Sequence, residues 1–172
     1  LNLSYGLYQP YAAKLLTDQA DGGKTKLVVA EWGSDRALIW NEVPKLNRPA
    51  DVVLGQQDLQ TTTMDRPPSS ALGNLYTPWS IASDGTSLLL GESSWHRLSI
   101  WSPIPRQSGI DRPLAPSGWW GQSDYLAPKI DAGLGLTHAL GAKRPVVFAE
   151  QAPGRGFYVS DYGNRRVLVF DG

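Results

Sequence analysis

The chain has 172 residues, of which 41% are apolar, enough for the core of a single domain. Sixteen basic and sixteen acidic residues give zero formal net charge, which disfavours nucleic acid or an anionic membrane surface as a partner. Cysteine is absent, which excludes disulfides, thiolate metal sites and a cysteine nucleophile, while 18 glycines and 13 prolines favour short strands joined by turns.

The N-terminal segment carries few signals. The chain begins with Leu1 rather than Met, which we interpret as a processed form or a fragment, such as a secreted protein cut after its signal. Its first ten residues lack the basic and apolar regions of a signal peptide, and no apolar run approaches the roughly 18–20 residues that span a bilayer. Alternation of apolar and polar residues predicts a short strand in 1–6. Asn2 begins an Asn-Leu-Ser tripeptide and is a candidate N-glycosylation site.

A first predicted unit spans residues 7–59. Leu7-Tyr8-Gln9-Pro10 precedes an expected innermost strand, because the first residue of a strand tolerates the missing donor of proline. Residues 18–23, DQADGG, have the composition of a turn. TKLVVAEWGSDRALIW at 25–40 predicts a hairpin, because two β-rich runs flank turn residues. Val52-Val53-Leu54 predicts an outer strand.

A second predicted unit spans residues 75–125. It follows a stretch rich in Thr, Pro and Ser, residues 60–74, which predicts a long surface loop. Leu75-Tyr76-Thr77-Pro78 repeats the word that leads into the first unit, and Asp84-Gly85 is a strong signal for a tight turn. The hairpin returns as TSLLLGESSWHRLSIW at 86–101.

A third predicted unit spans residues 144–172 and carries the clearest copy of the hairpin, GFYVSDYGNRRVLVF at 156–170. Residues 130–143, just before it, are rich in Gly, Ala and Leu and predict a loop or one short helix. Gly121-Gln122 aligns with Gly55-Gln56, which keeps the first two units in phase. The third unit lacks a predicted outer strand.

The three hairpins share one pattern. An acid ends the first strand, an arginine follows five residues later, and an aromatic residue four after that. These residues are Glu31, Arg36 and Trp40; Glu92, Arg97 and Trp101; and Asp161, Arg166 and Phe170. The arginines are 97 − 36 = 61 and 166 − 97 = 69 residues apart, a period that suits a propeller blade with a long loop. The sequence therefore predicts an all-β repeat protein, a β-propeller with about three blades in this chain.

The third copy, SDYGNRRVLVF at 160–170, resembles the NHL repeat, in which a strand ends in Asp, a short turn holds Gly and Asn, and an Arg opens the second strand. The words IWNEVP and IWSPIP, at 39–44 and 100–105, and VLGQQD and WGQSD, at 53–58 and 120–124, are similar to the bacterial form of that family. The resemblance implies four-stranded propeller blades and no particular ligand. The first two copies depart from the pattern, because Glu replaces Asp and because Ser34 and Trp95 stand where the third has Asn164.

Three blades do not close a ring, because propellers have about four to eight. An open set exposes strand edges and an apolar flank. We therefore expect completion by further sequence of a longer protein or by a second copy. In the second case two chains form a six-bladed ring, in which residues 1–6 of one chain supply an outer strand to the other. A head-to-tail contact that does not close would instead build a filament.

The repeated acids and arginines are interpreted as structural, since a hairpin uses such residues to satisfy turn amides and to pair charge. In the alternative interpretation, their carboxylates hold calcium, which takes six to eight oxygen ligands. Zinc catalysis usually needs three protein ligands, and the two histidines, His96 and His138, lie on different elements. This weakens the similarity to propeller lyases that release amidated peptides. No GxSxG turn is present either, so no catalytic residue is predicted.

Seven tryptophans are the one excess in the composition. Trp40, Trp101 and Trp79 are predicted to pack in the core. The candidates for binding a glycan or a protein partner are aromatic residues in or beside turns and loops, where exposed rings stack on sugars or anchor partners. They are Trp32, Trp95, Trp119, Trp120 and Tyr162. The competing interpretation for each is packing between blades.

These patterns lead to one expected function and two alternatives. We expect a non-enzymatic NHL-type propeller, a scaffold or interaction module that assembles with itself or belongs to a larger extracellular protein. The first alternative is a carbohydrate-binding propeller that uses exposed tryptophans. The second is a metal-dependent propeller enzyme, a lyase or hydrolase. The resemblance and the start without Met point to an extracellular or periplasmic location.

Overall fold

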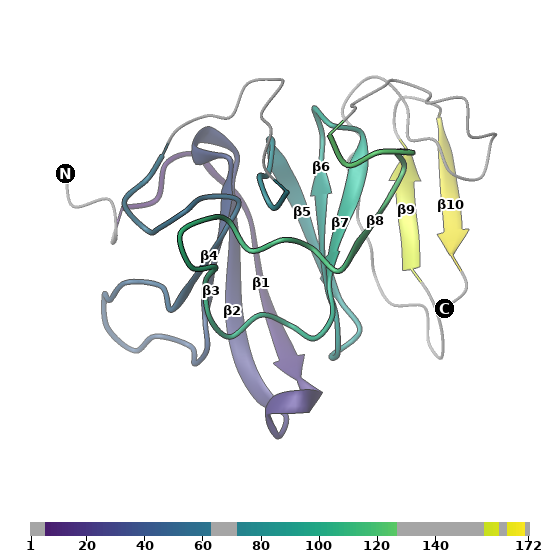
Figure 1. Ribbon diagram of the computed structural model, residues 1–172. Coiled ribbons are helices and arrows are strands. Elements are labelled where there is room, and N and C mark those ends of the chain that lie inside the picture. Colours follow the sequence, from purple (N-terminus) through teal and green to yellow (C-terminus); the bar gives the residue numbers. More distant parts are fainter. Residues whose placement is uncertain (1–5, 63–71, 127–156, 162–164, 171–172) are drawn as a thin grey trace.

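The computed structural model describes residues 6–62, 72–126, 157–161 and 165–170, and these residues form an all-β structure, as predicted (Figure 1). Four antiparallel strands form the first sheet, in the order β1-β2-β3-β4. They are β1 (Pro10–Asp18), β2 (Lys24–Glu31), β3 (Arg36–Trp40) and β4 (Val52–Leu54). The 3₁₀ turns η1 (Gln19–Asp21) and η2 (Trp32–Ser34) join β1 to β2 and β2 to β3.

The second sheet stands beside the first, and the third stands beside the second (Figure 1). The second sheet has the order β5-β6-β7-β8, and the described part of the third is a hairpin of β9 and β10. The strands are β5 (Pro78–Ser83), β6 (Leu88–Glu92), β7 (Arg97–Trp101), β8 (Gly118–Trp120), β9 (Phe157–Asp161) and β10 (Arg166–Phe170). The sequence therefore repeats one sheet with the same strand order in its first two units.

Several local predictions are confirmed by these bounds. Pro10 and Pro78 begin β1 and β5, and the predicted outer strand is β4. Strand β8 pairs with β7 as β4 pairs with β3, since Trp120 lies opposite Leu98 and Leu54 opposite Ala37. The predicted strand in 1–6, the segment 130–143 and the start of the third unit lie outside the described residues.

The core lies between neighbouring sheets. Because successive residues of a strand point to opposite faces, each sheet has a forward face, toward the next sheet in the chain, and a rear face. The forward face of the first sheet and the rear face of the second share one buried cluster, in which Val28, Ala37 and Ile39 meet residues such as Leu88, Leu90 and Trp101. In a second cluster, Ala82, Leu89 and Leu98 of the second sheet meet Phe157 and Val159 of the third.

The rear face of the first sheet is covered only in part. A third cluster buries its outer half, where Trp40 packs with Leu38, Val53 and Ala50. The Trp40 indole donates a hydrogen bond to the carbonyl of Arg48 (3.2 Å), so the β3–β4 connection folds over this half. The inner half, on β1, leaves apolar side chains exposed.

The connection between β7 and β8, residues 102–117, reaches back to the first sheet (Figure 1). Arg106 pairs with the buried carboxylate of Asp18 (3.3 Å), and its carbonyl accepts a hydrogen bond from the side chain of Asn41 (3.0 Å). The hydroxyl of Ser108 accepts the backbone N–H of Val53 (2.9 Å) on the edge strand β4. Polar contacts thus join the two sheets along with their shared core.

Candidate functional site

The repeated acid and arginine lie directly opposite each other at the end of every hairpin. The pairs are Glu31 and Arg36, Glu92 and Arg97, and Asp161 and Arg166. The residue before each arginine adopts a positive φ, which reverses the chain sharply enough for the arginine to face the acid. These residues are Asp35 (47°), His96 (50°) and Arg165 (53°). The regular spacing in the sequence therefore produces one recurring turn and one recurring ion pair.

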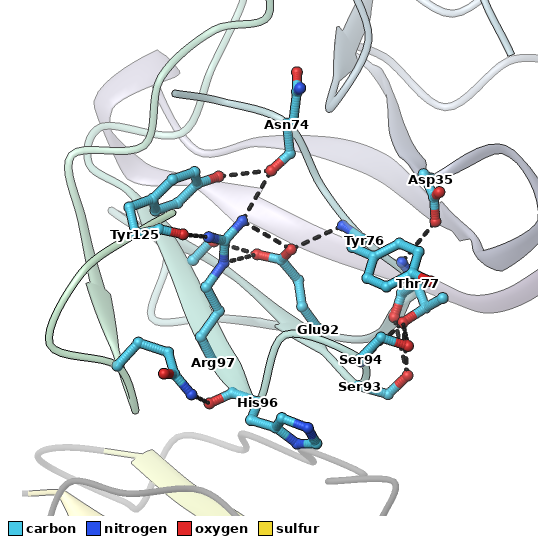
Figure 2. A network of polar contacts seen from close by, with 12 residues as sticks. Asp35, Asn74, Tyr76, Thr77, Glu92, Ser93, Ser94, His96, Arg97 and Tyr125 are labelled. Carbon is cyan, nitrogen blue, oxygen red and sulfur yellow. Dashed lines mark hydrogen bonds and ion pairs between the residues drawn. The ribbon is translucent and has the colours of Figure 1, made fainter. Parts of the chain in front are cut away.

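The pair of the second sheet is the centre of a buried network (Figure 2). The Arg97 guanidinium donates to both carboxylate oxygens of Glu92, from Nε at 2.7 Å and from Nη2 at 3.0 Å. It also donates to two backbone carbonyls from outside the hairpin, those of Tyr125 and Asn74. The carboxylate accepts the backbone N–H of Tyr76 (2.8 Å). Two distant segments, the one before β5 and the one after β8, are thus held to one hairpin.

The first sheet repeats this arrangement almost group for group. Arg36 donates from Nε to Glu31, from Nη1 to the carbonyl of Leu59 (2.8 Å) and from Nη2 to the carbonyl of Gly6 (3.3 Å). Glu31 accepts the N–H of Tyr8 at 2.8 Å. The predicted pairing of the acid with the arginine is confirmed. The sequence also predicted that the acid accepts amides of the turn, but the N–H that Glu31 accepts is that of Tyr8. It belongs to the segment leading into the innermost strand, because that segment runs past the carboxylate.

Tyr125 is a member of the second network that the sequence analysis missed. Its hydroxyl donates to the carbonyl of Asn74 (2.8 Å), and its ring lies 3.4 Å from the Arg97 guanidinium carbon, a cation–π contact. Burial, with a contribution from the Glu92 charge, holds the pKa of the Tyr125 hydroxyl above its usual value. Its only signal in the sequence is its place after the Gly-Gln word, where the first unit has Leu59.

The glutamine of each Gly-Gln pair donates a hydrogen bond to the turn of its hairpin. The amide of Gln56 donates to the carbonyl of Ser34 (2.9 Å), and that of Gln122 to the carbonyl of His96 (3.1 Å). Gly55 has a φ of 91°, and a Cβ there would lie 2.5 Å from the carbonyl oxygen of Asp35. Only glycine fits this close approach, and Gly121 has a similar φ of 96° where β8 ends.

A polar contact connects the first turn to the second sheet (Figure 2). The buried carboxylate of Asp35 accepts the backbone N–H of Thr77 (2.7 Å). The Thr77 hydroxyl lies 2.8 Å from the hydroxyls of both Ser93 and Ser94 and accepts the N–H of Ser94 (2.9 Å). These hydroxyls satisfy one another and the backbone, so the group positions the innermost strand of the second sheet.

The predicted aromatic binding residues separate into different environments. Trp32 is 38% exposed and remains a surface residue. Trp95 is 1% exposed, so the expectation of an accessible ring is wrong for it. The Trp95 ring lies 4.2 Å from the guanidinium carbon of Arg97 and is covered because the network closes over the turn.

Trp119 and Trp120 are both half-buried. Trp119 packs edge-on against Tyr125 with ring centroids 5.3 Å apart. Trp120 packs against Phe157 at 6.0 Å and joins the core between the second and third sheets. Tyr162 and Asn2 lie outside the described residues, as does His138. Phe170 lies on β10, while Trp40 and Trp101 are buried as predicted.

Trp32 belongs to an exposed aromatic group near the start of β1 that includes Tyr8 and Tyr11. The N–H of Trp32 donates to the carbonyl of Gln9 (3.2 Å), beside Tyr8. Tyr11 stacks on Trp79 of the second sheet with centroids 3.8 Å apart and ring planes inclined by 53°. This group presents flat apolar rings to solvent.

Neither a metal centre nor a membrane helix emerges in the part of the chain that the structure describes. There, no three His, Asp or Glu side chains gather in an arrangement able to hold a metal ion, and no helix is both long and apolar enough to cross a membrane. No model of a known protein family matches the chain, and no curated protein matches it either.

Proposed function

We propose that the chain contributes blades to an NHL-type β-propeller that serves as a non-enzymatic scaffold or interaction module. The observation that carries this proposal is the recurrence of one buried network in successive sheets that stack face to face. In that network the arginine and the acid form hydrogen bonds with each other and with backbone groups, as Arg97 and Glu92 do. We therefore assign these groups a structural role in each repeat rather than a catalytic one. A location outside the cytoplasm is part of the proposal and rests on the resemblance to NHL repeats.

The proposed module works by assembling with itself, into a closed ring or a filament. The test is the mass of the native particle by light scattering, beside the intact mass of the denatured chain, 18.8 kDa. We expect a dimer or a larger particle over a range of concentrations. A monomer throughout that range contradicts self-assembly.

A carbohydrate-binding propeller is the second candidate, favoured by the exposed group of Tyr8, Tyr11 and Trp32. Aromatic faces with this exposure suit stacking on sugar rings. The test is quenching of tryptophan fluorescence by a panel of glycans, with Trp32→Ala compared with the wild type. Saturable quenching that Trp32→Ala abolishes supports this candidate, and its absence across the panel counts against it.

A further inference from the structure

We infer that the forward face of the third sheet binds the rear face of the first sheet in a second copy of this chain. This inference rests on the proposed self-assembly and names the surfaces that carry it. The tail surface consists of Tyr158, Val167 and Val169 on β9 and β10. The head surface consists of Ala13 and Leu15 on β1.

The tail surface is an apolar sheet face open to solvent. Val169 lies opposite Tyr158 in the β9–β10 register, and Val167 follows on the same face two residues away. Val167 is 64% exposed and Val169 59%. On the opposite face, Phe157 and Val159 are buried against the second sheet. Exposed apolar side chains that are contiguous on one sheet face are a feature of protein–protein interaction sites.

The repeat shows what covers these positions when another sheet follows. Aligned on the acid and arginine, Tyr158, Val167 and Val169 correspond to Leu89, Leu98 and Ile100 in the second sheet and to Val28, Ala37 and Ile39 in the first. All three positions of the first sheet are fully buried under the second. Leu89 and Leu98 are likewise buried under the third. The natural cover for the tail surface is therefore the rear face of another such sheet.

The head surface is the matching half of that interface. Ala13 lies opposite Val29 and Leu15 opposite Leu27, so both belong to the rear face of the first sheet. Leu15 is 58% exposed. Aligned on Pro10 and Pro78, Ala13 corresponds to Ile81, which is buried against the first sheet. At Ala13, the head surface thus presents to solvent the position that the second sheet buries against the first.

A second copy is the partner that fits, because one chain carries both halves of an interface that it already makes twice internally. Neither surface contains a charged side chain, so shape and apolar burial decide the match. The contact is head to tail. Two copies that each place a tail on the other's head close a ring, whereas a rotation that does not close extends into a filament.

The test uses two charge variants, Val167→Glu on the tail and Leu15→Lys on the head. Each variant alone places an unpaired charge in every interface, so its dissociation constant should rise about a hundredfold or more. An equimolar mixture should restore assembly, because a mixed pair has one wild-type contact and one Glu–Lys contact. Ile110→Glu is the matched control, since Ile110 is 83% exposed on the β7–β8 connection, which is part of neither surface.

The outcomes separate this inference from the proposed function. A monomeric wild type overturns self-assembly itself. A wild type that assembles, with both variants folded by circular dichroism and unchanged in mass, overturns the head-to-tail surface and leaves self-assembly standing.

A cross-linking measurement keeps the inference testable if a charge variant does not fold. Because the chain has no cysteine, Leu15→Cys and Val167→Cys each introduce a single thiol. A bismaleimide should join the two variants when mixed and neither variant to itself. Efficient coupling of Val167→Cys to itself would mean that tail meets tail, and would overturn the inference.

Discussion

The second and third sheets carry the same acid and arginine at the same spacing, yet the two pairs lie in different surroundings. Arg97 is fully buried, lies against the rings of Trp95 and Tyr125, and reaches carbonyls outside its hairpin. Arg166 donates to Asp161 at 2.8 Å but is 23% exposed. The repeated pattern therefore sets the pair, while the segments that close over it set how strongly it stabilises the sheet.

Replacing Arg97 should have the largest effect. Arg97→Ala leaves the Glu92 carboxylate buried without its cation, a change that typically costs about 3–5 kcal/mol. We expect a loss of that size in urea unfolding, together with a smaller native mass, because both neighbouring sheets pack on the second. The control is Arg48→Ala, which removes a partly exposed ion pair with Asp51 and should cost about 1 kcal/mol or less. Equal stability of the two variants would contradict the comparison.

Arg166→Ala should have an intermediate effect. Its partner Asp161 is fully buried, so losing the charged hydrogen bond should cost about 1–3 kcal/mol. The partial exposure of Arg166 lets water reach the site and keeps the cost below that of Arg97→Ala. Urea unfolding of both variants under one set of conditions gives the order. If Arg166→Ala and Arg97→Ala lowered the free energy of unfolding equally, the surroundings of the ion pair would not determine its contribution to stability.

The aromatic position of the repeat also lies in different surroundings in the first two sheets. Trp101 and Trp40 each donate an indole hydrogen bond of 3.2 Å, to the carbonyls of Leu114 and Arg48, but only Trp101 packs between two sheets. Both Trp→Phe variants lose the same hydrogen bond. Trp101→Phe should cost about 1 kcal/mol more, because its cavity is enclosed from both sides. Thermal or urea unfolding measures the difference, and the opposite order would contradict it.

The smallest expected effect is pH-dependent and concerns the β5–β6 turn. Burial tends to raise the pKa of Asp84, but hydrogen bonds from the N–H groups of Ser87 and Thr86 and from the Thr86 hydroxyl outweigh it and hold the pKa below 3.8. This stabilisation is complete above pH 3.8 and is lost as the pH falls through the lowered pKa. Asp84→Ala should therefore cost about 0.5–1.5 kcal/mol at pH 7 and less at pH 3.

Urea unfolding of the wild type and Asp84→Ala at both pH values provides the measurement. Asp84→Asn, which keeps a side-chain oxygen as acceptor, is the matched control and should lose less at pH 7. If the difference in unfolding free energy between wild type and Asp84→Ala were the same at both pH values, the stabilising role of the ionised Asp84 carboxylate would be contradicted.

Local patterns were enough to predict much of the fold. Proline at 10 and 78 marked the first residue of two strands, and the short apolar run at 52–54 marked an outer strand. The spacing of acid and arginine predicted their pairing, because a hairpin of fixed turn length places fixed positions opposite each other. These features depend on neighbours in the sequence.

The burial of Trp95 and the role of Tyr125 were not predictable in this way. Both depend on contacts made across the chain, where the segment after β8 returns to the β6–β7 turn. A sequence period fixes which residues face each other in a hairpin but not which distant loop covers its end. The hydrogen bonds from the backbone N–H groups of Tyr8 and Tyr76 to the carboxylates of Glu31 and Glu92 were not predictable for the same reason.

The connection from β7 to β8 has a consequence for how the molecule opens. It fastens the second sheet to the edge of the first through Arg106 and Ser108, while the N–H of Gln19 donates to the carbonyl of Gly85 (2.7 Å) at the hairpin tips. The amide proton of Val53, on an edge strand, is thus shielded by a residue of the next repeat. Its exchange with solvent requires that loop to lift, so the first two sheets should behave as one cooperative unit in hydrogen exchange.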